Sequence, residues 1–148
     1  MNQALLALRQ RMAAYGIKAY IIPSSDPHQS EYVADAYKCR QYLSGFNGSA
    51  GTVVVTESEA GLWTDGRYFI QAAKELAGSG IDLYKMNEVG VPTFQEWLAQ
   101  KVGDGQVIGY DGRTLSVNDI KALKAALQND TIQLKGDRDL MGEIWHGR

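Results

Sequence analysis

The chain has 148 residues, of which 45% are hydrophobic and 22% are charged, the composition of an ordinary globular protein. This length fits one domain that is large enough to bury a core. Its 15 basic and 17 acidic residues give a formal net charge of −2, which offers no electrostatic case for binding nucleic acid or an anionic membrane.

The sequence carries no signal for a membrane span or for secretion. No run approaches the roughly 18 apolar residues of a membrane-spanning helix. The opening residues place Arg9 and Arg11 inside an apolar pattern, which is typical of an amphipathic helix and not of a signal peptide. The single cysteine, Cys39, excludes an internal disulfide and suits a reducing compartment. We therefore expect a cytoplasmic protein.

The first half of the chain predicts one helix, one strand and a hairpin followed by a second helix. Apolar residues recur at helical spacing from about Ala4 to Tyr15, and a buried strand follows at residues 19–22. Residues 52–56 and 61–64 are rich in β-branched and apolar side chains and are separated by the polar turn 57–59, which predicts a β-hairpin. Asp65 is a natural N-cap for the next helix, and Gly78 a natural end.

The second half alternates strands and helices. We predict strands at residues 81–86, 106–110 and 131–134. Thr93 and Glu96 form a capping-box pattern that opens a helix ending at Gly103. Ser116 caps a further helix, whose apolar side chains lie on one face.

This alternation predicts an α/β fold with a mixed, mostly parallel sheet of about six strands and helices on both faces. The hairpin supplies the antiparallel pair. We assign residues 1–138 to this domain and residues 139–148 to the start of a linker toward a following domain. Trp145 in that last segment has little left to pack on, although docking of the segment back onto the same domain is an equal alternative.

The positive charge of Arg67 is unfavourable at its predicted position in the sequence. In the first turn of an α-helix, where the helix dipole is positive, a cation is unfavourable by roughly 0.3–1 kcal/mol. Arg67 either pairs with a nearby carboxylate such as Asp65 or points toward an anionic group outside the helix. The sequence alone leaves both interpretations open.

The glycine-rich loop from Gly45 to Gly51 does not match a known catalytic or nucleotide-binding motif. Its spacing is G-x-x-G-x-x-G and it precedes a strand, whereas a dinucleotide-binding loop follows a strand and opens a helix. It is not a nucleophile elbow, because Asn47 replaces the first glycine of G-x-S-x-G and no helix follows Ser49. We interpret these glycines as tight backbone turns.

The residues alone provide no metal site and no catalytic set. The two histidines, His28 and His146, are far apart and have no zinc-like spacing to another ligand. His28 lies in a loop, where it is either a solvated side chain or a functional group. Cys39 has no histidine near it in sequence, so a buried small apolar residue is the favoured interpretation. We predict neither catalytic residues nor metal ligands within this chain.

Four stretches resemble one known family along almost the whole chain. They are DPHQSEY at 26–32, CRQYLSGFNGSAGTVVVT at 39–56, LWTDGRYFIQAA at 62–73 and DLMGEIWHGR at 139–148. Together they resemble the amino-terminal domain of the creatinase/prolidase family, and within it the three-domain Xaa-Pro aminopeptidase branch. The last stretch is similar to the junction with the middle domain in that branch.

The resemblance implies a parent peptidase that releases the N-terminal residue preceding a proline. Two divalent metals, commonly manganese, would be held by two Asp, one His and two Glu of a carboxyl-terminal domain that this chain does not contain. The amino-terminal domain would be non-catalytic, shape the substrate cleft and help form a homo-oligomer. By motif, Arg67 and His28 would contribute to substrate binding, and Phe46 would form an apolar wall or, as the commoner role, cover the sheet edge.

Two other readings remain. A prolidase or creatinase parent is the nearest enzymatic alternative. Relatives of the same fold that bind peptides or basic proteins without catalysis are the alternative from another class, although this chain lacks a strongly acidic run.

Overall fold

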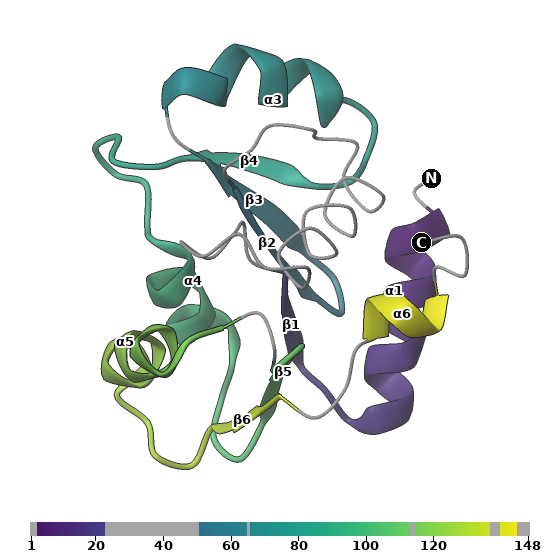
Figure 1. The fold of residues 1–148 in the computed structure, drawn as a ribbon, viewed down its shortest axis with the longest axis vertical. Helices are drawn as coiled ribbons and strands as arrows, with labels where there is room; N and C mark the ends of the chain where they lie inside the picture. The colour runs from purple at the N-terminus through teal and green to yellow at the C-terminus, as the bar shows by residue number, and fades with distance from the viewer. Residues whose placement is uncertain (1–2, 23–50, 65, 113–114, 137–139, 145–148) are drawn as a thin grey trace.

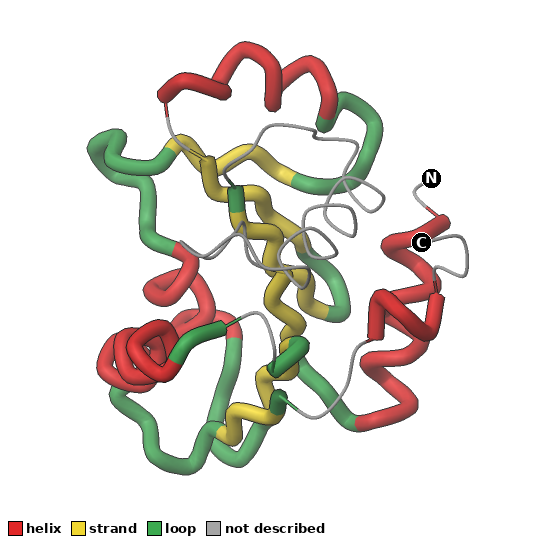
Figure 2. Tube along the Cα trace, in the orientation of Figure 1, coloured by secondary structure: helices red, strands yellow, loops and turns green. Residues whose placement is uncertain are grey.

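A computed structural model describes residues 3–22, 51–64, 66–112, 115–136 and 140–144, with backbone alone for residues 67, 141 and 142 (Figure 1). Within these ranges the chain forms a six-stranded sheet in the order β4-β3-β2-β1-β5-β6. The strands are β1 (Ala19–Ile22), β2 (Thr52–Thr56), β3 (Ala60–Thr64), β4 (Asp82–Lys85), β5 (Val107–Tyr110) and β6 (Gln133–Lys135). The helices, drawn red in Figure 2, are α1 (Gln3–Tyr15), α3 (Phe69–Glu75), α4 (Phe94–Lys101), α5 (Val117–Leu127) and α6 (Leu140–Ile144), with a 3₁₀ turn η1 (Gly66–Tyr68) before α3.

The sheet is mixed, with one strand running against the others. Among the described strands, β2 pairs antiparallel with both β1 and β3, whereas β1–β5, β5–β6 and β3–β4 are parallel pairs. The predicted mixed, mostly parallel sheet and the predicted hairpin are therefore confirmed. None of the helices in the described ranges has both the length and the apolar character needed to cross a bilayer.

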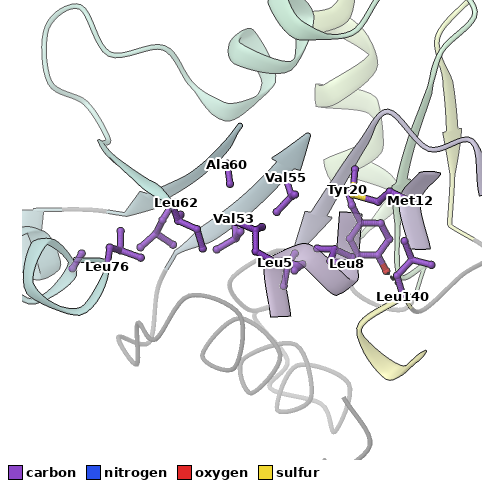
Figure 3. Close-up of a cluster of buried hydrophobic side chains, with 13 residues drawn as sticks. Leu5, Leu8, Met12, Tyr20, Val53, Val55, Ala60, Leu62, Leu76 and Leu140 are labelled. Carbon is purple, nitrogen blue, oxygen red and sulfur yellow. Dashed lines mark hydrogen bonds between the residues drawn. The ribbon is translucent and has the colours of Figure 1, made fainter. Parts of the chain in front are cut away.

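Alternating side chains of the strands separate two hydrophobic clusters, one on each face of the sheet. On one face, the strands pack against α1, α3 and α6 (Figure 3). On the other face they pack against α4 and α5. The register explains the division, because Tyr20 lies opposite Val55 and Ile22 opposite Val53, which places all four side chains on the α1 face. Helices on both faces, as predicted, follow from this alternation.

Two of the three predicted helix N-caps, those at Thr93 and Ser116, are present. The Thr93 hydroxyl accepts a bond from the Glu96 amide at 3.1 Å, and the Glu96 carboxylate accepts one from the Thr93 amide at 2.9 Å. Ser116 and Asp119 make the same reciprocal pair at the start of α5. Each box satisfies two backbone donors that would otherwise lack a partner, which fixes where α4 and α5 begin.

The last strand begins two residues later than predicted. Thr131 belongs to a turn in which its amide donates to Asn129 Oδ1 at 3.0 Å and its hydroxyl accepts from the Gly105 amide at 3.0 Å. Local side-chain bonds of this kind compete with strand pairing. The strand therefore starts at Gln133.

The short helix α6 packs back onto the domain. Leu140 is fully buried in the α1-face cluster, beside the ring of Tyr20 in Figure 3, and its amide donates to the Tyr20 hydroxyl at 3.2 Å. The Tyr15 hydroxyl donates to Glu143 Oε1 at 2.8 Å. Of the two alternatives for residues 140–144, docking onto this domain is what the structure shows. The domain division at residue 139 stays a prediction.

A group of aromatic side chains covers β3 and β4 on the face of the sheet that packs against α4 and α5. The rings of Trp63 and Tyr84 stack with centroids 4.4 Å apart and an interplanar angle of 8°. Trp97 of α4 packs edge-on against Trp63 at 5.3 Å, and its Nε1 donates to the Tyr84 hydroxyl at 3.1 Å. Gly61, two residues before Trp63 on the same strand, leaves the space in which these rings lie. The register pairs Trp63 with Tyr84, so the stack follows from the strand alignment.

Candidate functional site

The candidate site is the edge of the sheet at which five strands end. Because β1, β3, β4, β5 and β6 run in one direction, their carboxyl ends meet at this edge, where β2 begins. Ligands of open α/β sheets characteristically bind at such an edge, in loops that follow the strands. The terminal residues there are Ile22, Thr64, Lys85, Tyr110 and Lys135.

Arg67 lies at this edge, but not where the sequence placed it. Its backbone belongs to η1, directly after β3, and α3 begins only at Phe69. The N-cap of α3 is Tyr68, which makes no side-chain cap bond, so the predicted Asp65 cap of this helix is wrong. Asp65 itself lies outside the described residues. Because the 3₁₀ turn runs directly into α3, Arg67 still lies at the amino end of a helical segment, where the backbone dipoles disfavour a cation.

The other two candidate residues fall outside the described ranges. His28 and Phe46 lie between residues 23 and 50, and so does Cys39. The flanking residues are placed, however: the chain leaves β1 at Ile22 and returns at Gly51, both at the carboxyl edge. The structure thus brings the ends of that segment to the same edge as the Arg67 backbone. The roles of Arg67, His28 and Phe46 in substrate binding remain predictions.

The described part of this edge is tightly packed. Thr64 is fully buried, and its carbonyl accepts a bond from the Met86 amide at 3.0 Å, which fastens the segment after β4 to the end of β3. At the far side the Gly112 amide donates to the Gly136 carbonyl at 3.0 Å, an approach that a Cβ at either residue would obstruct. Partial burial raises the pKa of Tyr110 above its ordinary value, which keeps the hydroxyl protonated.

No sequence pattern indicated that the residues following β4 would form part of a binding site. Residues 86–95 read as an ordinary loop and helix start, yet residues 86, 87 and 91–95 line a pocket together with Trp63. Only the strand register, which brings β3 beside β4, places them together.

Metal-binding side chains do not gather in the part of the chain that the structure describes. Within those ranges no group of three or more His, Cys, Asp or Glu residues lies close enough to hold a metal ion. His28, Cys39 and His146 lie outside those ranges.

Comparison with known proteins gives consistent similarities. A family model described as the Creatinase/Prolidase N-terminal domain matches residues 5–139. Aminopeptidase P2 of Arabidopsis thaliana is 47% identical over 132 residues, which is 88% of this chain and 18% of that protein. The chain thus spans about a fifth of the length of the curated relatives that it matches.

Two solved structures show the same arrangement. X-prolyl aminopeptidase from Caenorhabditis elegans, described as a cytosolic enzyme with a di-nuclear active site, superposes with a TM-score of 0.82 at 35% identity, over 99% of this chain and 25% of that one. The N-terminal domain of the cytoplasmic peptidase PepQ from Mycobacterium tuberculosis superposes with a TM-score of 0.69 at 27% identity, over 98% of this chain and 100% of that one.

Proposed function

The chain belongs to the creatinase/prolidase N-terminal domain family, and on that basis we propose that it is the non-catalytic amino-terminal domain of a metal-dependent Xaa-Pro aminopeptidase. The observation that carries the proposal is the 47% identity to an aminopeptidase P over 88% of the chain, together with the 0.82 TM-score to an X-prolyl aminopeptidase. The substrate would be a peptide with proline at its second position.

Two observations support this division of labour between the domains. The described residues bring no metal-binding cluster together, whereas the C. elegans relative has a di-nuclear active site. We therefore assign the two divalent metals, with manganese as the expected ion, to a catalytic domain outside this chain. When bound there, such a metal pair activates water and polarises the scissile carbonyl. This domain would contribute the carboxyl edge to the wall of the cleft, in a cytoplasmic homo-oligomer.

The first prediction is that this chain alone hydrolyses no Xaa-Pro peptide, with or without added manganese. The reason is that catalysis requires the metal ligands of the other domain. The measurement is a peptide-release assay with metal analysis, on protein shown to be folded by a cooperative thermal transition in circular dichroism. Turnover by stoichiometrically metallated chain would contradict the proposal.

The gene supplies an independent check. The coding sequence after Arg148 should specify the two Asp, one His and two Glu that the family resemblance implies. Their absence would instead favour a binding module of the same fold without peptidase chemistry.

A second prediction concerns Arg67 in the full-length enzyme. An arginine at the cleft can hold a substrate carbonyl or carboxylate with its planar guanidinium fork. Replacing Arg67 by alanine should therefore lower kcat/KM for Xaa-Pro peptides by about tenfold, equivalent to about 1.4 kcal/mol of transition-state stabilisation. Arg67→Lys should recover only part of this loss, because a point charge does not reproduce the fork.

The same variant distinguishes binding from stability. If Arg67 instead pairs within its own domain, alanine will lower the melting temperature while kcat/KM at a lower temperature stays normal. That combination would remove Arg67 from the substrate site.

A further inference from the structure

The segment between β4 and α4 forms an ordered loop at the carboxyl edge of the sheet. It projects on the side of the molecule away from α1 and α6 (Figure 1). Asn87 and Gly90 adopt positive φ angles of 69° and 83°, and the Glu88 and Val91 amides donate to the carbonyls three residues before them at 3.3 and 3.2 Å. Two successive turns thus define the loop. Its first residue, Met86, bonds to Thr64, three positions before Arg67.

A pocket of about 150 Å³ lies at the root of this loop. Met86, Val91 and Phe94 form its apolar wall, and Trp63 also lines it. Cavities of about 150 Å³ hold a benzene-sized group, whereas sites for small-molecule ligands usually exceed about 300 Å³. The pocket therefore has the capacity for one apolar side chain.

The pocket is fixed before any ligand arrives. Trp63 is held by its stack on Tyr84 and by a bond from its Nε1 to the Pro92 carbonyl at 2.9 Å. The capping box at Thr93 fixes the start of α4 and with it the position of Phe94. A pre-organised wall reduces the entropy that binding has to overcome.

Two primary amides flank this apolar pocket. Asn87 and Gln95 both line it, and across the described residues neither side chain has a hydrogen-bond partner. Each amide offers N–H donors and a carbonyl acceptor, the complement of a peptide backbone. None of the described lining residues is charged.

Exposed apolar side chains lie on the loop and on α3. Met86 is 43% exposed, Val89 is fully exposed, and Ile70 of α3 is 77% exposed. The start of α3 lies beside the end of β4, because Lys85 Nζ lies 5.6 Å from the centroid of the Phe69 ring. Exposed apolar side chains such as Met86 and Val89, three positions apart on this loop, commonly mark interaction sites.

We propose that this loop pocket is a binding subsite for an extended peptide, which inserts one apolar side chain while Asn87 and Gln95 bind its backbone. The bound peptide is the part of a substrate that follows the proline. Its identification as a substrate rests on the proposed function. The pocket adjoins the carboxyl edge that carries Arg67, so one chain can reach both. The subsite confers a preference for longer peptides with an apolar downstream residue.

The test is a titration of the ¹⁵N-labelled chain with two blocked pentapeptides, one of glycine alone and one with a central leucine. We expect saturable shifts of the Asn87 and Gln95 side-chain amides and the Trp63 indole with the leucine peptide alone, with a Kd on the order of 1 mM. Gln95→Ala should weaken binding roughly three- to tenfold. Gln100→Ala, an exposed glutamine on the same helix, is the matched control and should leave the Kd unchanged.

Three outcomes would overturn the proposal. One is the absence of saturable shifts at about 20 times the expected Kd, and another is equal shifts with the glycine peptide. The third is a shift of the same resonances with protein concentration alone, which would make a second copy the occupant. No hydrolysis is involved, so failure here leaves the proposed function standing. Conversely, a missing catalytic domain would leave the binding result intact while removing its assignment to a substrate.

Discussion

Replacing Leu140 by alanine should lower the free energy of unfolding by about 3 kcal/mol, within the range of buried Leu→Ala changes. Leu140 is 0% exposed and packs among α1 and β1 side chains. Its loss leaves a cavity that the surrounding structure fills only in part. For a domain of this length the melting temperature should fall by roughly 6–12 °C in calorimetry. Deleting residues 139–148 should therefore also destabilise the domain, although the sequence allowed that segment to be a dispensable linker.

The matched control is Val117→Ala. Val117 is 72% exposed on α5, so its truncation should change stability by less than about 0.5 kcal/mol. If Leu140→Ala were as neutral as this control, α6 would not be part of the folded domain in solution.

Replacing Gly61 by valine should lower the free energy of unfolding by about 3 kcal/mol, at the upper end of overpacking effects. A Cβ at this position would lie 2.7 Å from both the Trp63 and Tyr84 rings. Neither ring can move aside easily, because Trp63 Nε1 is bonded to Pro92 and the Tyr84 hydroxyl to Trp97. Strand propensity alone would predict the opposite result, because valine is favoured over glycine in β-strands.

Gly103→Ala serves as the comparison for this change. A Cβ there would come no closer than 3.5 Å to the Gln106 side chain, an ordinary contact. Alanine should leave stability unchanged or raise it slightly by restricting the unfolded chain. Equal melting temperatures for Gly61→Val and the native chain in calorimetry would mean that the Trp63–Tyr84 stack does not persist in solution.

Local patterns were enough to predict most of the fold. The capping boxes at Thr93 and Ser116 depend on residues three positions apart, so the sequence contains both partners. The hairpin likewise needs only two apolar runs and a polar turn. The start of α3 could not be predicted this way, because Gly66–Tyr68 forms a 3₁₀ turn in place of the first α-helical turn after Asp65. Residues near helix starts commonly satisfy more than one such geometry.

The candidate site depended on contacts that the sequence does not display. The contribution of Gly61 requires the register that pairs Trp63 with Tyr84 across two strands separated by a helix. The loop pocket needs the same register, because Trp63 is distant in sequence from Phe94. The docking of Leu140 joins residues 120 positions apart. The family resemblance singled out Arg67, His28 and Phe46, but it carries no geometry for them.

The outermost strands limit how this domain can associate with other chains. β4 has four residues and exposes Asp82 and Lys85, while β6 has three and exposes Gln133 and Lys135. Short edge strands with charged side chains disfavour pairing with a foreign strand, the first step of sheet extension and fibril growth. Among the described strands, both ends of the sheet are protected in this way. Other chains are therefore expected to engage the domain through side-chain surfaces, and edge-to-edge aggregation of the sheet is disfavoured.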